Sequence, residues 1–97
     1  MKVVVRFCID ADIIDCPEHI MDKLTYYRNK FTDWLFDKNN CHTYWVIENG
    51  EKIGCCYRSE AFVEWLNRFV LKDSLQKAVV VEKEICIWDK NLPEVFF

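Results

Sequence analysis

The sequence feature that most constrains the fold is the dipeptide Asn49-Gly50, which separates two runs rich in β-branched and aromatic residues. An Asn-Gly pair in this setting is the strongest local signal for a two-residue hairpin turn, because both residues readily adopt positive φ angles. We therefore predict a β-hairpin whose strands cover residues 41–48 and 51–58.

The two-residue loop also sets the register of the hairpin, and with it the face on which each side chain lies. It predicts that Ile47 lies opposite Lys52 and that Val46 lies opposite Ile53. Lys52 and Arg58 then mark one face of the second strand as exposed to solvent.

Four further segments show the periodicity of strands or helices. Alternating apolar residues predict strands over 2–10 and 77–89. Apolar residues at helical spacing predict two amphipathic helices, over 15–38 and 59–73. A short apolar C-terminal tail, 90–97, follows the last strand.

The resulting order of elements is strand, helix, strand, strand, helix, strand. This order matches a ferredoxin-like split βαβ plait (βαββαβ) of the α+β class, in which a four-stranded antiparallel sheet carries both helices on one face. The 97 residues suffice for one hydrophobic core, so we predict a single domain over 1–97. The other face of the sheet is expected to lack a helical cover.

Composition narrows the compartment and the partners. The net charge of −3 gives no field that would attract polyanions, which disfavours nucleic acid as a partner. No apolar run is long enough to span a membrane, and no export signal precedes the first predicted strand. We therefore expect a cytoplasmic protein with no membrane association, whose six cysteines are free thiols.

The uncovered sheet face is the first candidate site. It is expected to display tryptophan and arginine side chains, which dominate binding hot spots, beside apolar residues. These candidate partner-binding residues are Val4, Arg6, Trp45, Ile47, Lys52, Arg58 and Trp88. A second copy of the chain, forming a homodimer through this face, is one occupant. The alternative is that tail residues Leu92, Val95, Phe96 and Phe97 fold back and cover the face within the chain.

A run of carboxylates without lysine or arginine is the second candidate site, an acidic edge. Its members are Asp10, Asp12, Asp15, Glu18 and Asp22. Asp15 and Glu18 are expected to cap the first helix, with the other carboxylates solvated. Clustered carboxylates also suit Mg²⁺ or Ca²⁺. A third interpretation is a mimic of a phosphate backbone that competes for a basic groove, as some phage or mobile-element inhibitors, such as anti-CRISPR proteins, do.

No constellation typical of catalysis stands out. Cys16 lies at a predicted helix start but beside two carboxylates, and no Gly-rich phosphate loop or C-x-x-C pair is present. We therefore predict no catalytic residue, no metal site and no cofactor. The sequence favours a non-enzymatic module that binds or inhibits another protein of unknown identity. The alternatives are an inhibitor of a basic nucleic-acid-binding groove, and a small enzyme or metal-binding domain at the acidic run.

Overall fold

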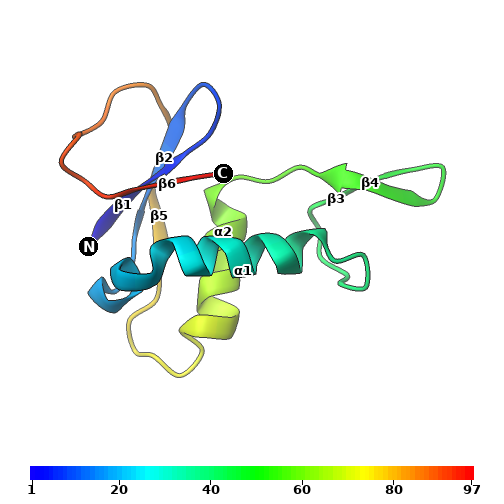
Figure 1. Cartoon of the computed structure of the whole chain (residues 1–97), viewed down its shortest axis with the longest axis horizontal. Helices are drawn as coiled ribbons and strands as arrows, with labels where there is room; N and C mark the ends of the chain where they lie inside the picture. Colours follow the sequence, from blue (N-terminus) through cyan, green and yellow to red (C-terminus); the bar gives the residue numbers. More distant parts are fainter.

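The computed structural model describes residues 1–97 and contains two separate sheets and two main helices (Figure 1). The strands are β1 (Lys2–Arg6), β2 (Ala11–Asp15), β3 (Trp45–Glu48), β4 (Glu51–Cys55), β5 (Val79–Ile85) and β6 (Glu94–Phe96). The helical segments are η1 (Glu18–Lys23), α1 (Leu24–Phe36), α2 (Ser59–Trp65) and η2 (Leu66–Val70). The α+β class is therefore confirmed.

The predicted ferredoxin-like topology is wrong. The main sheet has the order β5-β2-β1-β6, and the hairpin β3-β4 forms a second sheet of its own. A ferredoxin-like sheet would place the second hairpin strand beside β1. Here β1 pairs antiparallel with β2 on one side and parallel with β6 on the other, so no edge of β1 remains for the hairpin.

Strand β2 occupies a segment that the sequence pattern assigned to a loop and a helix cap. Asp12 and Asp15 break the apolar pattern of this strand, so the sequence does not indicate it. Its residues Ile13 and Ile14 are buried on opposite sides of the sheet. The first predicted strand accordingly ends at Arg6, and residues 7–10 turn the chain back into β2.

The C-terminal tail is also a strand. Val95 of β6 lies opposite Val5 of β1 in parallel register. Val95 is buried with the helices, and Phe97 packs at the border of the same core. The last predicted antiparallel strand is confirmed over Val79–Ile85, where it pairs with β2. The parallel pair of β1 and β6 joins two segments that lie at opposite ends of the chain.

Both predicted helices exist, with different beginnings. The first starts as a 3-10 turn at Glu18, preceded by Pro17, and no side chain caps it. The expected cap from Asp15 is therefore wrong, because Asp15 belongs to β2. The second helix starts at Ser59 as predicted and continues through the π-helical turn η2 to Val70.

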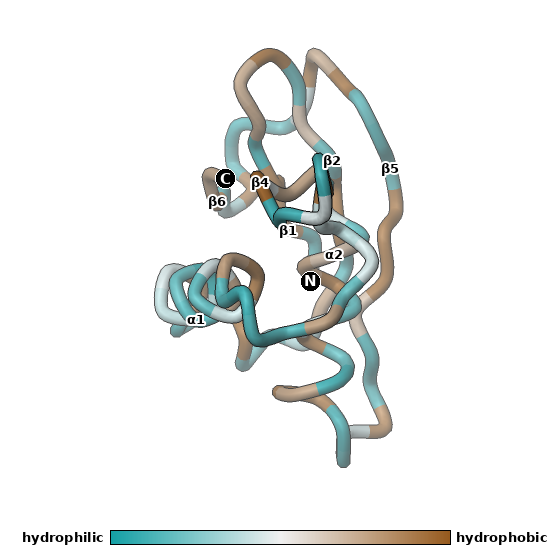
Figure 2. The backbone as a smooth tube through the Cα atoms, turned by 90° about the vertical axis from the view of Figure 1, so that its right-hand side faces the viewer, coloured by the Kyte–Doolittle hydropathy of each residue, from teal (hydrophilic) through white to brown (hydrophobic).

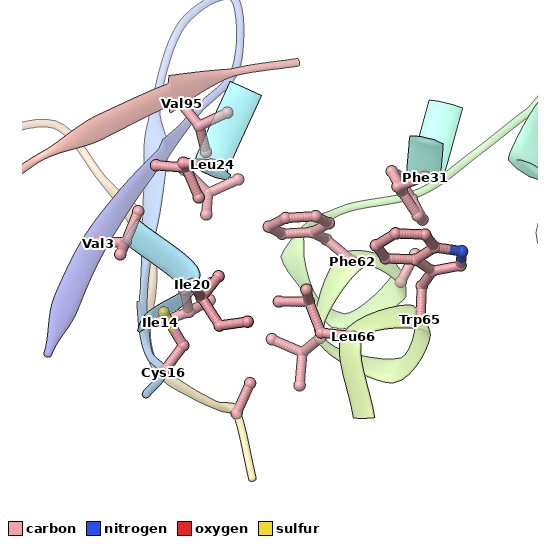
Figure 3. Packing of buried hydrophobic residues seen from close by; sticks show 14 of the residues in the cluster. Val3, Ile14, Cys16, Ile20, Leu24, Phe31, Phe62, Trp65, Leu66 and Val95 are labelled. Carbon is pink, nitrogen blue, oxygen red and sulfur yellow. The ribbon is translucent and has the colours of Figure 1, made fainter. Parts of the chain in front are cut away.

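The main core lies between the sheet and the helices. One side of it comes from the sheet and the first helical segments, and α2 supplies the other side, with Phe62, Trp65 and Leu66 (Figure 3). Phe31 of α1 is wholly buried and makes edge contacts with Phe62 and Trp65. The expectation that both helices cover one sheet face is consistent with this packing.

The hairpin turn is confirmed. Asn49 and Gly50 both have positive φ, 53° and 79°, as a two-residue turn of this kind requires. Ile47 lies opposite Lys52 as predicted. Val46 lies opposite Gly54 rather than Ile53, because β4 contains one residue more than β3 at this point.

Candidate functional site

The sheet face expected to be open is covered by the chain itself. On this face Val4, Ala11 and Ile13 form a small core, and Trp88 and Leu92 pack against it from the loop after β5. Val4 is wholly buried, so its expected exposure is wrong. The alternative of an intramolecular cover holds for Leu92, whereas Val95 packs with the helix-side core.

Arg6 and Trp88 belong to this cover. The Arg6 guanidinium lies between two rings, 5.2 Å from the centroid of Trp88 and 4.3 Å from that of Phe96. Glu94 accepts a hydrogen bond from Trp88 Nε1 at 2.7 Å and lies 3.7 Å from Arg6 Nη1. The Lys90 ammonium lies 3.8 Å from the centroid of the indole. Arg6 and Trp88 thus face other side chains of the chain, although the buried Arg6 Nε has no hydrogen-bond partner.

The acidic run does not form one acidic surface. Asp12 is wholly buried, Asp10 pairs with Arg58 at 3.0 Å, and Asp15 pairs with the N-terminal ammonium at 2.7 Å. Glu18 and Asp22 are exposed. Of the five carboxylates, two therefore remain free on the surface.

Asp12 is the centre of a buried polar network that sequence reasoning missed. Its Oδ1 accepts hydrogen bonds from Arg58 Nη2 at 2.6 Å and from the Glu84 amide at 2.9 Å. Its Oδ2 accepts from the Ser59 hydroxyl at 2.5 Å and the Ser59 amide at 3.3 Å. These contacts tie β2 to β5 and to the start of α2. The candidate binding residue Arg58 is therefore held in the interior network.

The network shifts both ionisable groups toward their charged forms. Burial alone would raise the pKa of Asp12, but the hydrogen bonds from Arg58, Ser59 and the Glu84 amide outweigh it, so this pKa lies below its ordinary value. The pKa of Arg58 is raised, chiefly by its hydrogen bond to Asp12. The ion pair is therefore formed across the neutral pH range.

The residues considered for catalysis or metal binding fall into two groups. Asp10 and Asp12 contact Arg58. Asp15, Cys16 and Glu18 line a hollow of about 740 Å³. Cys16 is nevertheless buried, and burial raises the pKa of its thiol, which opposes formation of a thiolate. No group of three or more His, Cys, Asp or Glu side chains is placed so that it could hold a metal ion. No helix has the length and apolar character needed to cross a membrane.

The candidate residues Trp45, Ile47 and Lys52 are brought together on the hairpin, which projects from the body of the molecule (Figure 1). We call the segment Trp45–Cys55 the arm. The molecule measures 44 Å along its longest axis and 19 Å along its shortest, in keeping with a projecting element. An isolated two-stranded hairpin is marginally stable in water, so the arm requires support at its root.

That support is a set of hydrogen bonds between the arm and the loop that follows α1. Trp45 Nε1 donates to the Asn40 carbonyl at 2.9 Å, and Lys52 Nζ donates to the same carbonyl at 3.2 Å. The Lys52 ammonium lies 5.1 Å from the centroid of the Trp45 ring. His42 stacks on Trp45 at 5.0 Å with the ring planes 8° apart.

Three further hydrogen bonds fix the root of the arm. His42 Nε2 donates to the Leu35 carbonyl at 2.7 Å, while its Nδ1 accepts from the Tyr44 amide at 3.2 Å. The Tyr44 hydroxyl donates to Glu64 of α2. Burial is the largest cause of the raised pKa of Tyr44, and the hydrogen bond to the Glu64 carboxylate is the next. Trp45 and Lys52 thus hold the arm in position, and sequence reasoning had assigned both a role in binding.

The arm carries apolar side chains that are about half exposed to solvent. Val46, Ile47 and Ile53 are 41%, 61% and 56% exposed. They are three of the large hydrophobic side chains on the surface, and they lie within eight residues of one another. The indicator in the sequence was the run Thr43–Ile47, whose side chains all favour strands.

Comparisons with known proteins leave the site to be judged on its geometry. No family model, no curated protein and no solved structure matches this chain.

Proposed function

We propose that this chain is a non-enzymatic protein-binding module whose recognition surface is the arm. The single observation that carries the proposal is the exposure of Val46, Ile47 and Ile53 on a rigidly rooted, projecting hairpin. Val46 and Ile47 are neighbours in β3 and point to opposite faces, so the arm offers apolar side chains on both faces. Exposed apolar surface of this kind marks interaction sites, because its exposure to water is otherwise unfavourable.

The remaining surface supports this choice. The sheet face that carries Val4 is covered by Trp88 and Leu92, and the carboxylates Asp10 and Asp15 are paired. Of the candidate residues, the carboxylates Glu18 and Asp22 and the arm residue Ile47 remain free on the surface, and Ile47 is the apolar one. The six cysteines are all unpaired, which fits a module that works in a reducing compartment such as the cytoplasm.

The proposal is tested by site-specific crosslinking in an extract of the source cells. A photo-reactive amino acid replaces Ile47 on the arm, and in a matched control it replaces Ile87, which is 89% exposed on the loop after β5. We expect discrete crosslinked proteins from position 47 that excess unmodified chain competes away. Equal crosslinking patterns from both positions would contradict the proposal.

A further inference from the structure

The four outer strand edges of the molecule differ in how they are protected. An unprotected edge presents unpaired backbone groups to any other strand, so proteins block their edges with bulges, lysines or covering side chains. Strands β5 and β6 bound the main sheet, and β3 and β4 bound the arm. Figure 2 shows β5 at the side of the molecule opposite α1.

Both edges of the main sheet are blocked. Strand β5 pairs with β2 through two register shifts, contains Glu84 at a φ of 53°, and carries Lys83 near its end. On β6, the Phe96 carbonyl accepts a hydrogen bond from Arg28 Nε of α1 at 2.9 Å. Both features are devices that hinder pairing with a second chain.

Edge β3 has no such device. The extra residue of the arm lies in β4, so β3 itself is regular. It contains no lysine, arginine, proline or glycine, and its one charged residue is Glu48 at the turn. Strand β4 carries this extra residue together with Lys52, so its own outer edge has two of the protecting features. The open edge of the arm is therefore β3.

The sequence of β3 is complementary to itself. Two antiparallel copies related by a two-fold axis must pair residues that share a face, so the axis has to pass beside a residue. An axis at Val46 places Trp45 of each chain opposite Ile47 of the other, and aromatic with β-branched is a favourable cross-strand pair. An axis at Ile47 would instead set Val46 against the charged Glu48.

We propose that the partner of the β3 edge is a second copy of this chain, paired antiparallel about Val46 into a four-stranded sheet formed by two arms. This inference rests on the proposed function of the arm and names one occupant of it. The paired arms then offer a single surface twice the width of one hairpin to a different protein.

Light scattering and sedimentation velocity of the full chain test the pairing through charge at the symmetry axis. The wild type is expected to show twice the chain mass of 11.7 kDa. Val46→Lys and Val46→Glu each place like charges opposite one another and should weaken the dimer by about tenfold or more. An equimolar mixture of the two variants should restore the dimer mass, because lysine then faces glutamate.

The matched control is Val81→Lys on β5, since Val81 is 43% exposed and Val46 is 41% exposed. This variant should remain dimeric, and circular dichroism of all variants should match the wild type. A wild type with the mass of one chain, a mixture that stays monomeric, or dissociation by Val81→Lys would each overturn the inference. A monomer whose position 47 still crosslinks to another protein would leave the proposed function standing, so the two failures are distinguishable.

Discussion

Replacing Asp12 by asparagine should destabilise the protein severely, although the two side chains have nearly the same shape. All four partners of Asp12 are hydrogen-bond donors, and two of them are the backbone amides of Ser59 and Glu84, one on each carboxylate oxygen. Either orientation of an asparagine amide therefore sets its NH₂ group against a backbone N–H. The variant also leaves Arg58 with Asp10 as its remaining counter-ion.

The magnitude follows from these losses. A buried donor left without an acceptor costs about 1–3 kcal/mol, and a lost hydrogen bond to a charged group costs about 1.5–3 kcal/mol. We expect Asp12→Asn to lower the free energy of unfolding by about 3 kcal/mol. A chain of 97 residues has a total of roughly 5–15 kcal/mol, so the loss is a large share of its stability.

Urea unfolding followed by circular dichroism measures this loss. The control is Asp15→Asn, because Asp15 is 48% exposed and its pair with the N-terminal ammonium should contribute less than about 1 kcal/mol. The double variant Asp12→Asn/Arg58→Gln should cost less than the sum of the single variants, since the two side chains act as one unit. A loss below about 1 kcal/mol for Asp12→Asn, or strict additivity with Arg58→Gln, would refute the account of the network.

Three further outcomes are expected. The pKa of Asp12 is lowered in the folded state, so its contribution to the free energy of unfolding should be fully present above about pH 4 and should disappear as the pH falls through the pKa of the folded state. Urea midpoints of the wild type and of Asp12→Asn at several pH values measure this contribution. A difference between the two midpoints that stays constant with pH would contradict the prediction. Trp88→Ala should uncover Val4 and cost about 2 kcal/mol, with increased binding of a hydrophobic dye; unchanged dye binding would show that the face was not covered by this ring. Gly50→Val should speed amide hydrogen exchange in the arm, because a β-branched residue is strained at a φ of 79°. Gly54→Ala is the control, since the added Cβ meets no atom within 4 Å and should leave the exchange rates unchanged. Equal exchange rates in the two variants would count against the turn geometry.

Local signals predicted the elements whose cause is local. The turn at Asn49-Gly50 depends on two residues that tolerate positive φ, and it forms where expected. The second helix begins at Ser59, where the polar residue precedes an apolar stripe. The pairing of Ile47 with Lys52 holds because it lies next to the turn, whereas the bulge at Ile53 displaces every pair beyond it.

Elements with a distant cause were missed. Strand β2 contains Asp12, and a buried carboxylate is acceptable there because Arg58, 46 residues away, neutralises it. Strand β6 forms by pairing with β1 at the other end of the chain. Once both sides of β1 are taken, the hairpin has no place in the main sheet, which no local pattern reveals.

The candidate site was predicted in part for the same reason. Ile47 lies on the exposed arm, as expected from the hairpin pattern. A single sheet would bring Val4, Arg6 and Trp88 to the same surface, whereas the structure places them under or within the chain's own cover. The part of the candidate surface that remains exposed is therefore the part on the hairpin, with Ile47.

Competition for crosslinking at the arm tests the central claim most directly. Unlabelled wild-type chain, Ile47→Ser and Ile87→Ser are each added in excess to the extract that contains the chain labelled at position 47. The arm as recognition surface predicts that wild type and Ile87→Ser suppress the crosslinked bands equally and that Ile47→Ser suppresses them far less. Equal suppression by both variants would contradict the claim that this protein binds its partners through the arm.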